Sequence, residues 1–428
     1  MKRRLLFIVL TLALLTAAFP AACSTDNTMQ VTAEPIMDNS AQVTIEPTME
    51  YFYVGSFSEG LAIVEDDGKC GFIDETGNIV IPLKYDADRF SYFSEGLALV
   101  YTGGRYMNAS QRIMQGGKCG FIDKTGRVII PLEYDNATAF SEGLAIVEKN
   151  KKQFIIDTSG AVVATLSAYY GNEKNTHGSS NAIRPFSNGL AAVRIDDRWG
   201  YIDRTGTEVI PVGKYEFGRR DFSEELTIAG IRVDSGNGRF YTNFGFVDKT
   251  GEVVIPFDYY WLGSFSDGLA TALYSDENYI MKYGVINKAG EAIIPFEYDY
   301  IGEFSEGLAS FEKDGKLGYM DETENIVISL EIEPTDTWGS SQLAPFSEGL
   351  AVVYDGNRID PNSAIMSPQS TAKYGVIDKT GKVVIPFEYD YISNFNNGFA
   401  IGFKGHADFY HYAFFGTWSI LQVDASVS

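Results

Sequence analysis

Short apolar runs separated by glycine-containing turns fill most of the chain. The run Leu61–Val64 is apolar at consecutive positions, which predicts a strand buried on both faces. Gly71–Asp74 predicts a second strand after a turn. The run that ends at Pro82 predicts a third, because proline cannot donate to a strand ladder and closes the run. The pattern predicts three strands in succession followed by an extended connector, and it requires no helix.

This three-stranded unit repeats along the chain. Each first strand follows the phrase Phe-Ser-Glu-Gly or a close variant, and successive phrases are spaced by about 42 residues. The phrases begin at Phe57, Phe93, Phe140, Phe186, Phe222, Phe265, Phe304, Phe346 and Phe395. Self-similarity at this period predicts a tandem array in which each unit packs against its neighbours.

The turn between the second and third strands of a unit has a physical explanation. It reads Asp-x-x-Gly, as at Asp123 and Gly126. The aspartate can accept hydrogen bonds from the backbone two residues on, and the glycine adopts a positive φ. In one phrase, Glu225 stands where the others have glycine. If that position requires a positive φ, the glutamate costs about 1 kcal/mol.

These features predict an all-β fold, a tandem array of about eight three-stranded β-meander units. Two assemblies would bury the strands, an open curved superhelix and a closed eight-bladed β-propeller. Residues 50–55 and 388–393 stand in the same register of the repeat, so the two ends duplicate one another. A ring would be expected to need complementary ends. The sequence therefore favours the open array, with the closed propeller as the alternative.

The first residues are typical of an exported protein. A cationic start precedes the apolar run Leu5–Phe19, which is short for a membrane span and has the flanks of a signal peptide. We therefore expect a signal peptide over 1–22. Residues 23–50, rich in Thr, Asn, Asp, Glu and Pro, predict a disordered tether. The repeat array is expected over 51–404 and a degenerate C-terminal cap over 405–428.

The residues around Cys23 resemble the lipobox of bacterial lipoproteins. Ala21 and Ala22 match the small positions before the cysteine. The resemblance implies that Cys23 is lipidated and becomes the first residue of a protein held on the membrane by its lipid anchor alone. Several acyl chains on one cysteine hold a protein stably, whereas a single chain gives marginal binding. An ordinary cleaved signal peptide is the alternative.

The repeat itself resembles the bacterial WG repeat, related to the KWG repeats of spirochaetes. The residues that carry this resemblance are Arg198–Asp203, which read Arg-Trp-Gly-Tyr-Ile-Asp, with Thr-Gly at 205–206 and Val-Ile-Pro at 209–211. It extends from about Tyr51 to Phe403. The resemblance implies an extracytoplasmic or surface-linked all-β array without established catalytic residues, and therefore a binding or scaffold role.

The place of Trp199 is taken by cysteine in two adjacent units. Equivalent positions in stacked units lie about 10 Å apart, whereas a disulfide needs Cα atoms within about 7 Å. Cys70 and Cys119 are therefore expected to be buried thiols, with a disulfide as the less favoured alternative.

Charge and composition narrow the function further. The net charge of −23 makes nucleic acid an unlikely partner. The sequence has three histidines and lacks His-Glu-x-x-His, Gly-x-Ser-x-Gly and Walker-type motifs. We therefore expect no metal, no cofactor, no catalytic residue and no enzymatic activity. A glycan-cleaving carboxylate pair is the less favoured hypothesis, because acidic pairs recur in every unit as turn residues.

Longer connections mark one edge of the predicted array. The loop between the first and second strands lengthens at Tyr101–Gly117, Asp234–Asn243, Ser275–Lys282 and Asp355–Lys373. Insertions confined to one connection lie along one edge of an array, often the binding edge. The candidate binding residues are Arg105, Tyr106, Arg112, Met114, Asn357 and Arg358. The sequence predicts an exported monomer presenting a β surface to an unknown protein or envelope glycan. A structural spacer without a specific ligand is the alternative.

Overall fold

The computed structural model describes residues 43–49, 51–86, 91–106, 114–167, 170, 183–195, 198–216, 221–234, 240–275, 280–330, 343–355, 373–408 and 413–423. Secondary structure within these residues consists of β-strands and turns. None of the described segments forms a helix long and apolar enough to cross a membrane.

The strands group into nine units of the repeat. Unit 1 contains β2 (Tyr53–Ser58), β3 (Leu61–Asp66), β4 (Lys69–Asp74) and β5 (Ile79–Asp86). Unit 2 contains β6 (Phe93–Ser94), β7 (Leu97–Tyr106), β8 (Met114–Asp123) and β9 (Val128–Tyr134). Unit 3 contains β10 (Asn136–Ala137), β11 (Leu144–Lys149), β12 (Lys152–Asp157) and β13 (Val162–Thr165). Unit 4 contains β14 (Ile183–Ser187), β15 (Leu190–Ile195), β16 (Arg198–Asp203) and β17 (Glu208–Ile210).

The remaining units follow the same order. Unit 5 contains β18 (Leu226–Asp234), β19 (Phe240–Asp248) and β20 (Val253–Tyr259). Unit 6 contains β21 (Trp261–Leu262), β22 (Leu269–Ser275), β23 (Met281–Asn287) and β24 (Ala292–Tyr298). Unit 7 contains β25 (Tyr300–Ile301), β26 (Leu308–Lys313), β27 (Lys316–Asp321) and β28 (Ile326–Leu330). Unit 8 contains β29 (Leu350–Asp355), β30 (Lys373–Asp378) and β31 (Val383–Tyr389). Unit 9 contains β32 (Tyr391–Ile392), β33 (Phe399–Asp408) and β34 (Ala413–Val423), completed by β1 (Val43–Met49).

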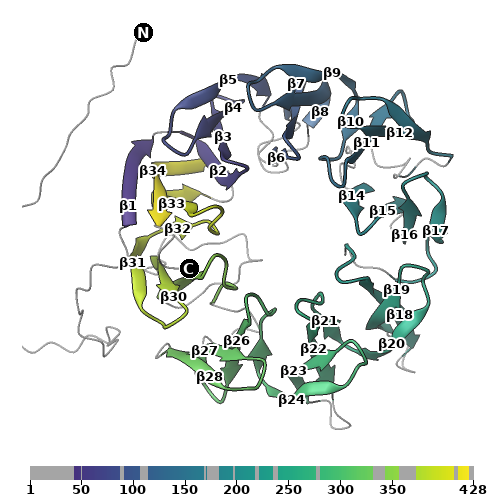
Figure 1. The fold of residues 1–428 in the computed structure, drawn as a ribbon, viewed down its shortest axis with the longest axis vertical. Helices are drawn as coiled ribbons and strands as arrows, with labels where there is room; N and C mark the ends of the chain where they lie inside the picture. Colours follow the sequence, from purple (N-terminus) through teal and green to yellow (C-terminus); the bar gives the residue numbers. More distant parts are fainter. Residues whose placement is uncertain are drawn as a thin grey trace, which may run out of the picture.

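The units stand side by side around a ring (Figure 1). Within a complete unit the sheet order follows the chain, as in β21-β22-β23-β24, with the short first strand nearer the centre and the last at the perimeter. Successive strands are antiparallel, so the turns alternate between the two faces of the ring. The Phe-Ser-Glu-Gly and Asp-x-x-Gly turns lie on one face, called here the phrase face. The connection between the strand that follows the phrase and the next strand, such as β3 and β4, lies on the other face, called here the hairpin face. Counted with the short inner strand, these two are the second and third strands of a unit.

The core lies between neighbouring units, because the second and third strands are buried on both sides. One core cluster joins Phe246, Ile255 and Tyr259 of unit 5 to Phe265 and Ile286 of unit 6. At five junctions the phenylalanine of the phrase packs edge-on or tilted against an aromatic ring on the third strand of the preceding unit. The pairs are Phe72 with Phe93, Phe121 with Phe140, Tyr201 with Phe222, Phe246 with Phe265 and Tyr319 with Phe346, at centroid separations of 4.5–5.0 Å.

The tandem array of three-stranded meanders is confirmed, and none of the described sheets curls into a barrel. Its ends, however, are joined rather than free. Strand β1 pairs antiparallel with β34, from Val43 opposite Val423 to Met49 opposite Trp418. The indole Nε1 of Trp418 also donates to the carbonyl oxygen of Tyr51 at 3.1 Å. These contacts join the ends of the array into a ring, the second of the two assemblies considered, and the described strands form nine units.

The joining of the ends has a simple physical cause. Unit 9 has only three strands of its own, and the outer edge of β34 would otherwise present unpaired backbone groups. Residues 43–49, within the segment expected to be a tether, supply that missing outer strand as β1. Residues 413–423, within the expected cap, form β34. The inner strands β2 and β32 do hold the same place in their units, and the complementary ends are instead β1 and β34.

The predicted turn and thiol chemistry is also present. Asp123 Oδ1 accepts hydrogen bonds from Thr125 Oγ1 (2.6 Å) and Thr125 N (2.9 Å), and Gly126 has a φ of 81°. The hydroxyl of Thr125, with further hydrogen bonds from the backbone, lowers the pKa of Asp123 to about 2. Cys70 and Cys119 are buried thiols outside any disulfide.

Each Phe-Ser-Glu-Gly turn is bonded to the same turn of the next unit. Ser58 Oγ donates to the carbonyl oxygen of Phe93 at 2.7 Å, and the N–H of Gly96 donates to Glu59 Oε2 at 3.0 Å. The equivalent glycine N–H of the next phrase donates to five further glutamates, Glu95, Glu142, Glu224, Glu306 and Glu348. We call this arrangement the glutamate clamp.

The glutamate clamp also carries an ion pair at several junctions. A basic residue from the Asp-x-x-Gly turn of the next unit reaches the carboxylate, as Lys124 does at Glu59 (3.1 Å). The same pairing joins Arg204 to Glu142, Lys288 to Glu224 and Lys379 to Glu306. The clamping glutamate itself has a positive φ, 52° at Glu59, which costs a non-glycine residue about 1–2 kcal/mol. Glu225, which stands where the other phrases have glycine, has a φ of 75°. That position therefore does require a positive φ.

We predict that the free energy of unfolding falls at acid pH, because the glutamates of the glutamate clamp become protonated. Burial alone would raise the pKa of Glu306, but hydrogen bonds from Gly349 N, Lys379 Nζ and Glu348 N lower it below the ordinary 4.5. The pKa values of Glu59, Glu142 and Glu224 are lowered in the same way. A carboxyl whose folded-state pKa is depressed contributes stability above 4.5, and that contribution is lost as pH falls through the folded-state value.

Urea unfolding at pH 7 and pH 3.5 measures this effect. The Glu306→Gln variant should be less stable than wild type at pH 7, and the difference between the two proteins should shrink at pH 3.5. An equal difference at both pH values would contradict the assignment.

Candidate functional site

The sequence-predicted binding residues lie on two units that are not neighbours. Arg105 and Tyr106 end β7, and Met114 begins β8, where Tyr106 pairs with Met114 at the end of the hairpin ladder. This places the hairpin of unit 2 on the hairpin face, as expected. Cys23, Arg112, Asn357 and Arg358 lie outside the described residues. Units 2 and 8, which carry these two loops, are not neighbours, because units 9 and 1 lie between them.

The other two lengthened hairpins belong to adjacent units. They are β18–β19 of unit 5 and β22–β23 of unit 6. The junction between them lacks an arrangement of charged residues that recurs at four other junctions on the hairpin face.

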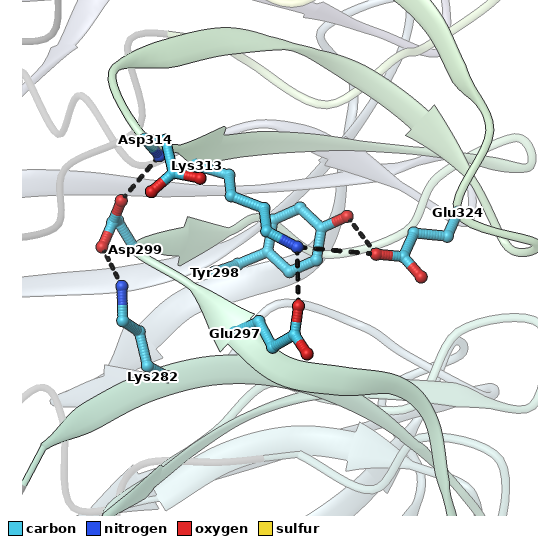
Figure 2. A network of polar contacts seen from close by, with 7 residues as sticks. All are labelled: Lys282, Glu297, Tyr298, Asp299, Lys313, Asp314 and Glu324. Carbon is cyan, nitrogen blue, oxygen red and sulfur yellow. Dashed lines mark hydrogen bonds and ion pairs between the residues drawn. The ribbon is translucent and has the colours of Figure 1, made fainter.

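At a typical junction, an aspartate after the outer strand fastens two units together. Figure 2 shows this for units 6 and 7. Asp299 Oδ1 accepts from Lys282 Nζ of its own unit at 2.5 Å, and its Oδ2 accepts from the backbone N–H of Asp314 in the next hairpin at 3.1 Å. Asp86, Asp135 and Asp390 make the same pair of bonds. We call this arrangement the aspartate clamp.

A second lysine completes the typical junction. Lys313, at the end of the second strand of unit 7, lies 2.9 Å from Glu297 and has its ammonium 4.5 Å from the ring centroid of Tyr298 (Figure 2). Lys149 lies in the same way between Glu133 and Tyr134, and Lys404 between Glu388 and Tyr389. In each case a carboxylate and a tyrosine ring of one unit hold an ammonium group supplied by the next.

Unit 7 adds one feature to this arrangement. Glu324 occupies the turn position where most units have glycine, and the hydroxyl of Tyr298 donates to its carboxylate at 2.6 Å (Figure 2). Burial raises the pKa of Tyr298, and the hydrogen bond to Glu324 raises it further. The hydroxyl therefore stays protonated and acts as a structural donor.

The junction of units 5 and 6 has lost both lysines and the aspartate. Strand pairing shows which residues of units 5 and 6 are equivalent. Phe244 pairs with Tyr259 in unit 5, and Tyr283 pairs with Tyr298 in unit 6. Asn243 therefore stands in the place of Lys282, and Tyr260 in the place of Asp299. Counting from the first residue of each second strand, Tyr274 stands in the place of Lys313. Asp258 and Tyr259 keep the carboxylate and the tyrosine.

A pocket of about 370 Å³ opens at this junction. Its walls are the aromatic residues Tyr259, Tyr260, Tyr274 and Phe296, with Asn243, Asp258 and Ser275 as the polar members. The rings support one another. Tyr274 lies 5.4 Å from Phe296 and 6.3 Å from Tyr259 between centroids, and Tyr260 stacks on Tyr241 with an interplanar angle of 7°. The pocket is therefore an aromatic recess with one carboxylate, that of the exposed Asp258.

Two polar groups define its electrostatics. Burial raises the pKa of Tyr259, and the nearby Asp258 carboxylate and Tyr274 raise it further, so the Tyr259 hydroxyl stays neutral. Asn243 Oδ1 is buried and accepts no hydrogen bond from the described residues. A buried carbonyl oxygen without a donor costs about 1–3 kcal/mol, which a ligand with an N–H or O–H group would relieve. The recess suits a ligand that combines a donor with positive charge or a flat apolar face.

Loop length indicated the hairpins of units 5 and 6 but not the residues that form the pocket walls. The sequence did contain a signal for the pocket walls. The third-strand lysine and the Glu-Tyr-Asp triplet recur along the chain, so a unit that lacks them stands out. A position-by-position comparison of the units would have shown Asn243, Tyr260 and Tyr274 as the departures. Replacement of three charged residues at one junction is a stronger signal than loop length.

Comparison with known proteins gives one family and several distant folds. The sequence model of the WG containing repeat matches residues 36–70, 71–106, 120–152, 181–199, 199–235, 244–275, 283–316 and 374–401, which is more than half of the chain. None of the curated proteins matches the chain.

Three solved structures resemble it distantly. A eukaryotic initiation factor is 11% identical with a TM-score of 0.47, covering 79% of this chain and 87% of that one. The tricorn protease is 11% identical with a TM-score of 0.33, covering 84% and 33%. PorZ, a bacterial surface component of the type-IX secretion system of Porphyromonas gingivalis, is 13% identical with a TM-score of 0.28, covering 86% and 51%. The chain thus spans about a third of the tricorn protease chain and about half of PorZ.

We predict that Asn243→Leu stabilises the protein. The substitution removes the buried oxygen that lacks a donor, so the free energy of unfolding should rise by about 1 kcal/mol. Urea unfolding measures the change. The matched control is Lys282→Leu, the same position in unit 6, which removes the partner of Asp299 and should not stabilise. A destabilised Asn243→Leu would show that Asn243 already makes its bonds within the folded chain.

Proposed function

The chain belongs to the family of proteins built from WG-containing repeats, and from that premise we propose that it is a non-catalytic binding protein. Its hairpin face would be presented to a protein or a cell-wall glycan outside the cytoplasm. A repeat fold of this kind favours a binding or scaffold role. The observation that carries the proposal is the junction of units 5 and 6, where the aspartate clamp has been replaced by an aromatic pocket.

The chemistry of the recurring carboxylates supports a non-catalytic role. In the turns, carboxylates such as Asp123 accept hydrogen bonds from their own backbone. On the hairpin face, carboxylates such as Asp299 join two units. Because these acidic groups recur with the same structural partners, their abundance is explained by the fold. A pocket with one carboxylate lacks the acid and base pair that glycoside hydrolysis requires.

The proposal places the protein outside the cytoplasm on a lipid anchor. The support is the cationic start, the apolar run and the small residues before Cys23. With residues 43–49 engaged in the ring as β1, residues 24–42 form the connection to a lipidated Cys23. A chain of that length spans at most about 60 Å, at 3.3 Å for each residue.

We predict that Cys23→Ser releases the protein from membranes. In a bacterial host, metabolic labelling with a tagged fatty acid should label the wild-type chain and leave the variant unlabelled. The matched control is Cys70→Ser, which changes a buried cysteine of the ring and should keep the label. Equal labelling of wild type and Cys23→Ser would refute the anchor and leave the binding role to be judged separately.

We predict that the pocket captures an envelope component. The purified full chain, immobilised and incubated with a cell-envelope extract, should retain a protein or glycan that a Tyr260→Ser/Tyr274→Ser variant retains at least tenfold less. Tyr274 is 41% exposed, so the variant should keep the wild-type unfolding midpoint within a few degrees. A comparable double change on the perimeter, Ile326→Ser/Val327→Ser, should keep capture intact. Equal capture by the pocket variant would refute the proposed site.

A further inference from the structure

The pocket between units 5 and 6 corresponds to a position that holds an ammonium group elsewhere in the ring. At the junctions of units 2 and 3, 6 and 7, and 8 and 9, the ammonium of Lys149, Lys313 or Lys404 lies 2.7–2.9 Å from a glutamate. The same ammonium lies 4.3–5.9 Å from the centroid of the adjacent tyrosine ring. The fold therefore builds one cation-binding constellation repeatedly and fills it with its own lysine.

At the junction of units 5 and 6 the receiving half of that constellation is retained. Asp258 supplies the carboxylate and Tyr259 the ring, on an outer strand with the same buried and exposed pattern as the strand that ends at Tyr298. Only the donor is missing, because Tyr274 takes the place of the lysine. Among the described residues no lysine or arginine forms an ion pair with Asp258.

The substitutions enlarge the site and add aromatic surface. Tyr274, Tyr260 and Phe296 join Tyr259 around the pocket of about 370 Å³. Cations are attracted to the faces of aromatic rings, and several rings around one recess strengthen that attraction where water is excluded. Asn243 Oδ1 is a buried acceptor without a donor, which an ammonium or guanidinium N–H would satisfy. The nearby Lys282 is neutralised by Asp299.

We infer that this pocket binds a lysine or arginine side chain of a partner polypeptide, taking the place of the lysine that the chain supplies at three other junctions. The inference rests on the proposed binding function and names its ligand class. The carboxylate of Asp258 pairs with the incoming charge, the rings of Tyr259 and Tyr274 face it, and Asn243 accepts one of its hydrogens. The net charge of −23 attracts basic segments toward the ring as a whole.

Calorimetric titration of the full chain in 150 mM salt with an acetylated, amidated tetralysine tests the inference. Wild type should bind with one site. Asp258→Asn should bind at least tenfold more weakly. Tyr274→Lys should also bind at least tenfold more weakly, because its new ammonium occupies the site from within. The charge-matched control Glu252→Gln removes one negative charge from an exposed turn on the phrase face and should bind as wild type.

The reverse substitution provides a second test. Lys313→Tyr at the junction of units 6 and 7 removes the internal ammonium from between Glu297 and Tyr298 and should add a second tetralysine site. Unchanged binding by Tyr274→Lys would overturn the inference, as would unchanged stoichiometry in a folded Lys313→Tyr. Tighter binding of spermine than of tetralysine would overturn the polypeptide assignment in favour of a free polyamine.

The same variants separate this inference from the proposed function. If chitotetraose binds in a manner that Tyr274→Lys abolishes, and tetralysine does not bind, the pocket serves a glycan and the cation inference fails. If neither probe binds but envelope capture still depends on Tyr260 and Tyr274, the proposed function stands and the cation inference fails. If capture is also unaffected by those substitutions, both fail.

Discussion

The structure depends on bonds between consecutive units, above all on the glutamate clamp of the phrase face. At six junctions the glutamate of the phrase accepts from the next turn, and at five of these the serine also donates to it, as Glu59 and Ser58 do with Gly96 and Phe93. The phenylalanine that follows packs on the preceding third strand. One short phrase thus fixes the backbone turn, the polar contact and the apolar contact of such a junction. This is why the phrase persists while other positions vary.

The clamp explains why an acidic residue is kept at a strained position. Glu59, Glu95, Glu142, Glu224, Glu306 and Glu348 all have positive φ values between 50° and 56°. Glycine would relieve that strain but could not reach the next unit. The bond to the neighbouring N–H offsets the conformational cost, because it satisfies a backbone donor at a partly buried turn. At the seam, Asn397 takes the place of the glutamate, and the pairing of β1 with β34 joins units 9 and 1.

Local features of the fold were predictable from sequence, and its closure was not. The Asp-x-x-Gly turns and the three-strand meander follow from residues whose effects act within a few positions, such as Asp123 and Gly126. Closure depends on β1 meeting β34 across the whole chain, which no local pattern reports. The sequence offered one hint, because nine phrases precede about eight complete units. The ninth unit is therefore short of a strand, which β1 supplies. For the pocket, loop lengths indicated the face, whereas the walls required comparison of equivalent positions such as Tyr274 and Lys313.

A repeat ring can give up one clamp at little cost, which explains how a site could arise within it. The lysine and aspartate of a typical aspartate clamp are partly exposed, with side chains 31% and 41% accessible at Lys282 and Asp299. Such pairs contribute about 0–1 kcal/mol. Units 5 and 6 remain joined by a shared core and by the bond of Gly268 to Glu224 on the opposite face. The absence of the aspartate clamp from this junction therefore costs little stability. It leaves Asp258, Tyr259 and their aromatic neighbours facing outward, with the geometry to hold a charge that the chain itself no longer supplies.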